Sequence, residues 1–486
     1  MKRMQFTSLW WAVLSGILLA LATPYFGYWF LAPVALVPFG MFLESNPSRW
    51  KLVLATLLMS FPFCLFSGEP LFRLAGTWWA VGGENQHFVD MIMYPAGILG
   101  IILVATFSYL IPVFIYRATR TSFTYASLLV GATWAIVEFF RSAVLFAGYS
   151  WGVLGYALID SLYLKHFAAL VGVSGLSFLS VALGMWGGRQ LVSLYHGEWK
   201  LKHTFFVKDD MRDTLAVCVV FVLVLSFGIV REFIGPPPPT QPMRVAVIGS
   251  VVRTEESVSE GSYRMYRKLF LDAIAARADI IAAPENVFPY FVVDEDAKAL
   301  IARPEVYLEN TALLYEDFLA ISRGAPNVTF ALPTHTNNAG KRYNSILLYR
   351  DGQITSVYHK RKPVPFTEYS PFGFRLPLFE TIAKGPSRQD FRLDDTPIGG
   401  YICSEIGITP LGVGTTRLII APSNDSALLS DAIGPLQHQF ARMRSLEAGA
   451  YMLRSSKGGI SSVINPYGEA LATMEGENGL LILDLK

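Results

Sequence analysis

Three residues in the second half of this 486-residue chain carry the side chains that covalent acyl transfer requires. They are Glu285, Lys360 and Cys403, and each comes at the end of a segment whose residues fit a buried or half-buried strand. A carboxylate at such a place can act as general base and acid, and a lysine can neutralise a thiolate or an oxyanion. A thiol at a strand end presents its sulfur to a cleft. The set therefore predicts transfer through a thioester on Cys403.

Each of these residues also has a plainer interpretation. Glu285 alone fits a solvated loop carboxylate, and Lys360 alone fits a surface lysine beside Arg361 and Lys362. Cys403 alone fits a structural cysteine, because free cysteines are among the most buried side chains. Ligand sites of α/β sheets gather at the ends of strands, so three candidates at strand ends are expected to meet. Their joint occurrence favours a catalytic site.

Other chemistries fit the sequence poorly. The seven histidines show no metal-ligand spacing, and Cys403 has no second cysteine near it, since Cys64 and Cys218 lie in long apolar runs. We therefore expect no metal and no cofactor. No Gly-x-Ser-x-Gly segment occurs in this half, which argues against a serine hydrolase. A formal net charge of +2 without a lysine-rich arm argues against nucleic-acid binding.

The elements that must position the three residues alternate between strands and helices. The strand candidates are 243–251, 278–284, 328–333, 343–349, 354–360, 397–403, 417–422 and 460–464, and the helix candidates are 257–277, 308–323 and 434–454. Asp351 and Gly352 stand between two alternating runs and predict a hairpin turn. This pattern is typical of an α/β fold with helices covering the sheet.

The first half of the chain has the composition of a membrane domain. The whole chain is 52% hydrophobic and 16% charged, with a mean hydropathy of +0.39. Seven spans are expected, near 8–23, 28–43, 52–68, 91–116, 124–140, 167–187 and 214–234. Some are shorter than the roughly 20 residues of a perpendicular span. Any one of these could be a buried or re-entrant helix, and the first could be a signal peptide, although no small-residue cleavage site follows it.

The positive charges predict the orientation of these spans. With a cytoplasmic N-terminus, the segments on that side hold Lys2, Arg3, Arg49, Lys51, Arg117, Arg120, Arg189, Lys200, Lys202, Lys208 and Arg212. The opposite side holds Arg73, Arg141, Lys165 and Arg231. An odd number of spans places the second half of the chain outside the cytoplasm. We therefore expect a transmembrane helical domain at 1–235, a proline-rich linker at 236–242 and an extracytoplasmic catalytic domain at 243–486.

The motifs around the three residues are similar to those of the nitrilase superfamily. They are Ala283-Pro-Glu-Asn, Tyr358-His-Lys with Val364-Pro-Phe-Thr-Glu-Tyr, and Ile402-Cys-Ser-Glu-Ile. In the first half, Val137-Glu-Phe-Phe-Arg, Gly148-Tyr-Ser-Trp-Gly and Val171-Gly-Val-Ser-Gly extend the resemblance. Over nearly its full length the chain resembles the bacterial apolipoprotein N-acyltransferase family. The resemblance implies a nitrilase-like α-β-β-α sandwich on a multi-pass membrane helical bundle.

The resemblance also implies an activity and roles for individual residues. Glu285 would be the general base, Lys360 the oxyanion stabiliser and Cys403 the nucleophile, with Glu368 and Glu405 as supporting carboxylates. An acyl chain would pass from a phospholipid through the Cys403 thioester to the N-terminal amine of a diacylglyceryl apolipoprotein. The family implies a periplasmic catalytic domain in the bacterial inner membrane, without metal or cofactor, and we expect a monomer.

The sequence also departs from the family pattern. Ser404, which we include among the supporting residues, stands where the family has tyrosine, and Lys457 stands where it has asparagine. The family ends in an eighth membrane helix, whereas this chain stops at Lys486. Two alternatives therefore stay open. One is a membrane-tethered C–N hydrolase, amidase or acyltransferase acting on a different amine, and the other is an inactive scaffold that keeps the fold.

Overall fold

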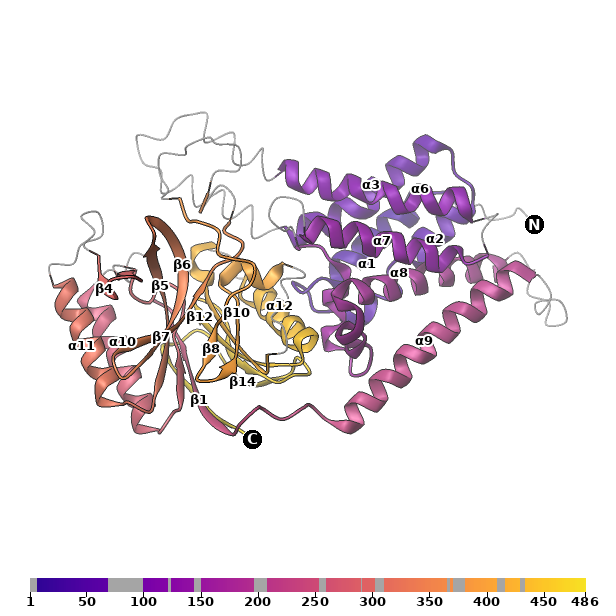
Figure 1. Cartoon of the computed structure of the whole chain (residues 1–486). Helices are drawn as coiled ribbons and strands as arrows, with labels where there is room; N and C mark the ends of the chain where they lie inside the picture. The colour runs from indigo at the N-terminus through magenta and orange to yellow at the C-terminus, as the bar shows by residue number, and fades with distance from the viewer. Residues whose placement is uncertain are drawn as a thin grey trace, which may run out of the picture. The chain divides into compact units, whose positions relative to one another are not determined.

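A computed structural model of the chain divides it into two compact units, Met1–Gly235 and Pro236–Lys486 (Figure 1). We call them the helical unit and the α/β unit. The structure describes residues 7–68, 99–120, 124–143, 150–195, 208–252, 259–289, 291–301, 310–364, 368–369, 381–408, 416–428 and 433–486. The division falls at the proline run, where the composition of the sequence also changes.

The described part of the helical unit consists of apolar helices with short 3-10 segments between them. The α-helices are α1 (Trp10–Ala22), α2 (Val37–Glu44), α3 (Arg49–Ser67), α6 (Leu110–Thr119), α7 (Ala126–Ala143), α8 (Ala168–Tyr195) and α9 (Lys208–Ile234). The 3-10 segments are Trp29–Leu31, Leu154–Asp160 and Leu164–Phe167. Among the described residues, five helical stretches are long and apolar enough to cross a membrane: Arg49–Ser67, Leu99–Thr119, Ala126–Ala143, Leu164–Tyr195 and Met211–Ile234.

Five of the seven expected spans thus have a helix of sufficient length, and the first two differ from expectation. Helix α1 is apolar but only 13 residues long. The span expected at 28–43 is not one helix, because it holds a three-residue 3-10 turn and then the eight-residue α2. Proline breaks it: Pro38 sits in the first turn of α2, where a missing N–H costs nothing. Residues 91–98 of the fourth expected span lie outside the described residues.

Glycines let the helices of this unit approach one another closely. A Cβ atom added to Gly16 on α1 would lie 2.8 Å from the carbonyl oxygen of Met59 on α3. One added to Gly131 on α7 would lie 2.7 Å from the carbonyl oxygen of Phe178 on α8. Apolar helices in lipid gain little from the hydrophobic effect when they associate, so small residues at their contacts allow the dispersion contacts that hold them.

Helix α7 also carries a buried carboxylate. Three donors converge on Oε1 of Glu138, namely Trp134 Nε1 at 2.8 Å, the Tyr109 hydroxyl at 3.1 Å and the Leu154 backbone N–H at 3.2 Å. The guanidinium of Arg141, one turn further along α7, is also buried and interacts with Glu138 electrostatically. An ionisable residue in an apolar helix is costly unless neighbours satisfy it, and these donors satisfy one oxygen of the carboxylate.

The described residues of the α/β unit form two main sheets, a two-stranded sheet of β8 and β9, and three α-helices. The larger sheet has the strand order β15-β1-β2-β5-β3-β4, with β6 pairing with both β5 and β7, and the second sheet has the order β10-β11-β12-β13-β14. Its strands are β1 (Met243–Gly249), β2 (Ile280–Ala282), β3 (Val292–Asp294), β4 (Ala299–Leu300), β5 (Thr329–Asn338), β6 (Lys341–Arg350), β7 (Gln353–His359), β8 (Arg392–Leu393), β9 (Thr396–Pro397), β10 (Gly399–Gly400), β11 (Leu418–Asn424), β12 (Tyr451–Lys457), β13 (Ser461–Ile464), β14 (Ala470–Met474) and β15 (Gly479–Leu485). The helices are α10 (Glu260–Ala275), α11 (Thr311–Gly324) and α12 (Ile433–Ala448).

Two apolar cores define the layers of this unit. One core joins α10 and α11 to the outer face of the larger sheet, with Phe270 and Phe318 packed against Phe330 of β5. The other core lies between the two sheets and includes Val247 of β1 and Leu453 of β12. Helix α12 covers the outer face of the second sheet, and Figure 1 shows the helices on both sides of the strands. The expected α-β-β-α sandwich is confirmed.

Three local predictions can be compared with these elements. The hairpin is confirmed, with Asp351 and Gly352 in the left-handed region between β6 and β7. The helix expected at 434–454 is too long, because α12 ends at Ala448 and Gly449 turns the chain into β12 at a φ of +60°. All seven residues of β12 are buried, and the short apolar run at 450–453 lacks the alternation that would distinguish a strand from further helix. The strand expected at 397–403 is reduced to the short β9 and β10.

Candidate active site

The ends of β2 and β7, which have β5 and β6 between them in the larger sheet, bring Glu285 and Lys360 to the same edge of that sheet. Glu285 stands three residues beyond the end of β2, and Lys360 directly follows β7. Asn344 of β6 links them: its carbonyl oxygen accepts the Lys360 backbone N–H at 2.8 Å, and its Nδ2 donates to Glu285 Oε1 at 2.9 Å. The expected meeting of strand ends therefore occurs, with an asparagine between the two charged residues.

Glu285 is buried and each of its carboxylate oxygens accepts a hydrogen bond. Oε1 accepts from Asn344, and Oε2 accepts the backbone N–H of Asn424 at 3.0 Å. Asn424 is the last residue of β11, in the second sheet. The carboxylate is thus held between the two sheets of the sandwich, with its oxygens fixed by one donor from each sheet.

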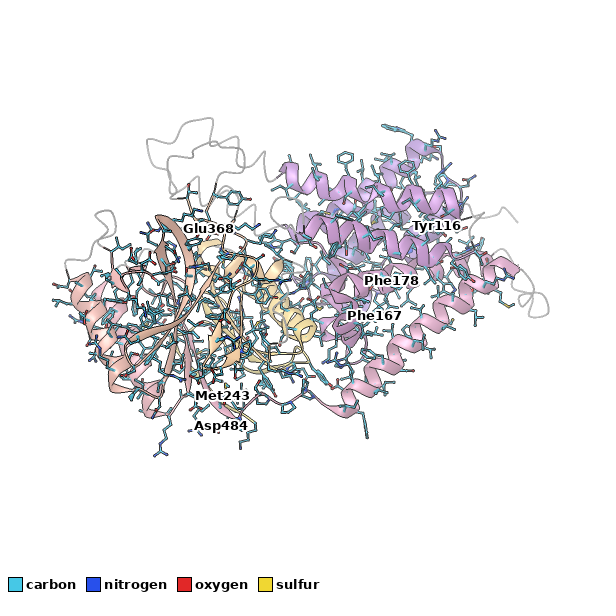
Figure 2. All side chains as sticks on the ribbon, in the orientation of Figure 1. Tyr116, Phe167, Phe178, Met243, Glu368 and Asp484 are labelled. Atoms are coloured by element: carbon cyan, nitrogen blue, oxygen red, sulfur yellow. The ribbon has the colours of Figure 1, made fainter. Side chains whose placement is uncertain are left out.

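Lys360 is 1% exposed and forms an ion pair with Glu368. Its Nζ lies 2.8 Å from Glu368 Oε2, and the same oxygen accepts the backbone N–H of Val364 at 2.6 Å. Glu368 Oε1 accepts a second hydrogen bond from Asn344 Nδ2 at 3.1 Å. In Figure 2, Glu368 lies at the end of the α/β unit opposite to the labelled Met243 and Asp484, which belong to β1 and β15.

Cys403 does not end a strand, as the sequence suggested, but begins a 3-10 helix, Cys403–Gly407. Its φ is +51°, in the left-handed region that non-glycine residues rarely adopt. Such strain is found where surrounding structure enforces it, often at functional sites. The residue is half-buried and packs against the core between the sheets. The residue that carries the thiol is therefore only partly enclosed by the core.

The charges of the three residues act on one another. Burial raises the pKa of Cys403 to about 12, the carboxylate of Glu285 also raises it, and Lys360 lowers it. Burial alone would lower the pKa of Lys360, but Glu368, Glu285 and Cys403 together raise it above the usual range. At neutral pH the cluster accordingly holds a protonated thiol and a protonated lysine.

Glu405 is buried and acts on the backbone around the site. Its carboxylate accepts the N–H groups of Arg361 at 2.6 Å, Lys362 at 3.1 Å and Ile402 at 2.8 Å. The Tyr358 hydroxyl adds a fourth hydrogen bond at 3.0 Å, and burial raises the pKa of this carboxyl group. One side chain therefore ties the turn that carries Cys403 to the segment after Lys360.

The predicted supporting residues differ in what they contact. Glu368 and Glu405 both bind parts of the cluster, whereas the buried Ser404 hydroxyl has no hydrogen-bond partner among the described residues. Asn344 and Asn424 also belong to the site, although no role was expected for either of them. A polar asparagine in the strand candidate 343–349 was the available signal for Asn344, but Asn424 contributes a backbone N–H, which any residue carries.

Comparison with known proteins agrees with this architecture. Residues 247–486 match the family described as carbon-nitrogen hydrolase, and residues 15–186 match the apolipoprotein N-acyltransferase N-terminal domain. The fold and site thus define a nitrilase-type carbon–nitrogen hydrolase domain joined to a membrane helical region. Among solved structures, a mutant of the Nesterenkonia AN1 amidase from the nitrilase superfamily is 16% identical, with a TM-score of 0.38 over 51% of this chain and 92% of that chain.

Curated relatives match across both units. Apolipoprotein N-acyltransferase of Aquifex aeolicus is 24% identical over 404 residues, which cover 80% of this chain and 82% of that protein. The enzyme of the same name from Azotobacter vinelandii is 27% identical over 483 residues, covering 94% of this chain and 85% of that protein. The chain belongs to the apolipoprotein N-acyltransferase family.

Proposed function

We propose that this chain transfers a fatty acyl group from a phospholipid to the N-terminal amine of a diacylglyceryl apolipoprotein, through a thioester on Cys403. The single observation that carries the proposal is the charge cluster in which a left-handed, half-buried cysteine interacts with Glu285 and Lys360. The names of the relatives supply the acceptor class. The membrane-type helices of the same chain fit a lipid donor.

The protonation states assign a role to each residue. With a pKa of about 12, the Cys403 thiol needs a base to become a nucleophile at neutral pH. Lys360 holds its proton too tightly to be that base, so its cation is suited to stabilising an oxyanion. Glu368 is engaged by Lys360 and by Val364 N–H. Burial alone would raise the Glu368 pKa, but the Lys360 charge and the hydrogen bonds to the carboxylate together lower it. Glu285 is therefore the general base.

In the first half-reaction, Glu285 takes the thiol proton while the sulfur attacks the ester carbonyl carbon of the phospholipid. The resulting oxyanion faces Lys360. The intermediate collapses by breaking the bond to the glycerol oxygen, and Glu285 returns the proton to that oxygen. Lysophospholipid leaves, and the acyl group remains on Cys403 as a thioester.

In the second half-reaction, the N-terminal amine of the apolipoprotein attacks the thioester carbonyl. Glu285 takes a proton from the amine, and the carbon–sulfur bond breaks. The proton returns to the sulfur, which restores the thiol and leaves an amide on the lipoprotein. The thioester divides one transfer between two bulky lipids into two steps with one lipid chain bound covalently.

The location is inferred from the distribution of lysine and arginine in the sequence. We infer a multi-pass protein of the bacterial inner membrane whose catalytic domain, 243–486, lies on the periplasmic side. Residues 236–242 form a short linker, stiffened by Pro236–Pro239. A tether of this length keeps the domain close to the membrane, where both substrates reside, and so raises their effective concentration.

The proposal is tested with purified full-length protein in phospholipid vesicles that carry a radiolabelled acyl chain. We expect label on the protein in the absence of acceptor, and transfer of that label to an added diacylglyceryl-cysteine peptide. Mass spectrometry should show a gain of one acyl chain on the peptide's α-amine. Label released as free fatty acid with the peptide unchanged would instead indicate a hydrolase.

A further inference from the structure

A second lysine, Lys457, is buried close to the proposed base. It is the last residue of β12 and its relative exposure is 0%. Its Nζ donates a hydrogen bond to the carbonyl oxygen of Asn286 at 2.7 Å. Asn286 is the residue directly after Glu285. The amine of Lys457 is therefore anchored to the backbone turn that carries the carboxylate.

The alternation of side chains along β12 explains why Lys457 reaches this turn. Successive residues of a strand point to opposite faces. Arg454 and Ser456 both bind Asp425, whereas Ser455 donates to the carbonyl oxygen of Ile248. Lys457 shares the face of Ser455, and so it points toward the larger sheet rather than toward Asp425.

The backbone of Lys457 belongs to the same arrangement. In the register of β11 and β12, Lys457 pairs with Asn424, whose N–H donates to Glu285 Oε2. Lys457 also forms an isolated parallel bridge with Ser250, just beyond the end of β1. The end of β12 thus contacts the larger sheet, the strand that donates to Glu285, and the turn directly after Glu285.

The turn itself requires such an anchor. Asn286 has a φ of +55°, in the left-handed region, which is unfavourable for residues other than glycine although asparagine tolerates it better than most. A backbone held in this conformation persists only when neighbouring groups fix it. The hydrogen bond from Lys457 Nζ is a contact of that kind.

We propose that Lys457 is a positioning residue for the transfer reaction: by holding the Asn286 carbonyl it fixes the left-handed turn, and with it the Glu285 carboxylate, against Cys403. This inference rests on the proposed role of Glu285 as general base. A base that lies even one ångström from its working position loses about a hundredfold in rate, so the contact matters to chemistry beyond its contribution to folding.

The test measures the rate at which the full-length protein in labelled phospholipid vesicles acquires an acyl group in its first turnover. In Lys457→Met the aliphatic stem is kept and the donor is lost, so we expect acylation to slow by about tenfold to a hundredfold. Phospholipid concentration dependence should be unchanged. Lys457→Gln retains an N–H donor and should recover at least part of the rate.

A double-mutant cycle with Glu285→Asp separates positioning from general stability. The aspartate moves the carboxylate back by one methylene, so it removes the placement that Lys457 is proposed to provide. We expect the double variant Lys457→Met/Glu285→Asp to be little slower than Glu285→Asp alone, because the two changes disturb one arrangement. Multiplicative losses would overturn the proposal, and so would Lys457→Met acylation at the wild-type rate.

Ser455→Ala is the matched control, since it removes a buried donor to a backbone carbonyl on the same face of β12. We expect Ser455→Ala to lower the thermal midpoint. Its loss of acylation rate should multiply with the loss caused by Glu285→Asp. If Lys457→Met fails to fold, the same cycle is run with Lys457→Leu, which also lacks the donor, and multiplicative behaviour there also overturns the proposal. Full acylation in Glu285→Gln would instead refute the base assignment and leave the function to be revised.

Discussion

The helical unit and the α/β unit each place a cysteine beside a carboxylate and an arginine or lysine. In the α/β unit these are Cys403, Glu285 and Lys360. In the helical unit the Cys64 thiol interacts electrostatically with Arg141 and Glu138, and with the hydroxyl of Thr106. The residue types are nearly the same, but their surroundings differ.

The difference lies in the backbone conformation and in the exposure of the residue. Cys64 is fully buried in the last turn of α3, where the Gly68 N–H donates to its carbonyl oxygen. Cys403 is partly exposed at a left-handed turn, and its base is held by donors from two different sheets. A cysteine, a carboxylate and a cation therefore make a reactive site only where the fold places the cysteine at a turn of the backbone and fixes the base beside it.

Removing each thiol gives the largest contrast between the two clusters. We expect Cys403→Ala to reduce acyl-enzyme formation by at least about a thousandfold, because it removes the nucleophile. Cys64→Ala should leave the rate within about twofold of wild type. The measurement is labelled acyl chain retained on the protein after denaturation. Label retained by Cys403→Ala, or lost in Cys64→Ala, would reverse the assignment of the two clusters.

Glu368→Gln tests whether the lysine must be held as a cation. Burial favours the neutral lysine, and without this carboxylate less negative charge offsets that effect, so the pKa of Lys360 falls. We expect acylation to slow by about a hundredfold at neutral pH. The loss should grow as pH rises through the lowered pKa, whereas the wild-type lysine stays protonated throughout.

This effect is measured as the rate of first-turnover acylation between about pH 6 and about pH 10. Asp317→Asn is a suitable control, because Asp317 pairs with Arg267 on the surface helices α10 and α11. It should not change the profile. Parallel pH profiles for Glu368→Gln and wild type would argue that Glu368 only supports the local fold.

Glu138→Gln examines the helical cluster by the same kind of change. The amide keeps an oxygen for the three donors but loses the charge that faces Arg141. We expect a loss of about 1–3 kcal/mol in the free energy of unfolding, seen as a lower thermal midpoint in detergent. Acylation per folded molecule should be unchanged. A slower rate without a lower midpoint would show that this cluster also takes part in the reaction.

The sequence predicted much of this comparison, and its limits have physical causes. Glu285 and Lys360 could be placed because they come after apolar runs that form β2 and β7. The left-handed turn at Cys403 could not, because nothing in its side chain demands a positive φ. The extent of α12 was overestimated because a short apolar run at 450–453 follows Gly449, and such a run fits a buried strand and further helix equally well. Contacts such as that of Lys457 with Asn286 join residues 171 positions apart, beyond any local pattern.

The smallest expected effect concerns the raised pKa of Cys403. The folded thiol has a pKa of about 12, against a reference value of 9.0. Below pH 9 both folded and unfolded chains keep the proton, so this group favours the folded state fully. Between about pH 9 and about pH 12 the unfolded chain loses the thiol proton and the folded chain keeps it, so the free energy of unfolding falls as pH rises.

At about pH 10.5 the loss from this one group is on the order of 2 kcal/mol. Cys403→Ser removes the thiol that titrates. The thermal midpoint of this variant should therefore fall less than that of wild type between about pH 8 and about pH 10.5. Cys218→Ser, at an exposed position of α9, should fall as wild type does. Equal falls in all three proteins would mean that the Cys403 thiol ionises as readily in the folded chain as in the unfolded one. Glu285 would still have a proton to remove at neutral pH, because a thiol with a pKa near 9.0 is mostly protonated there, but burial would no longer make that proton harder to remove.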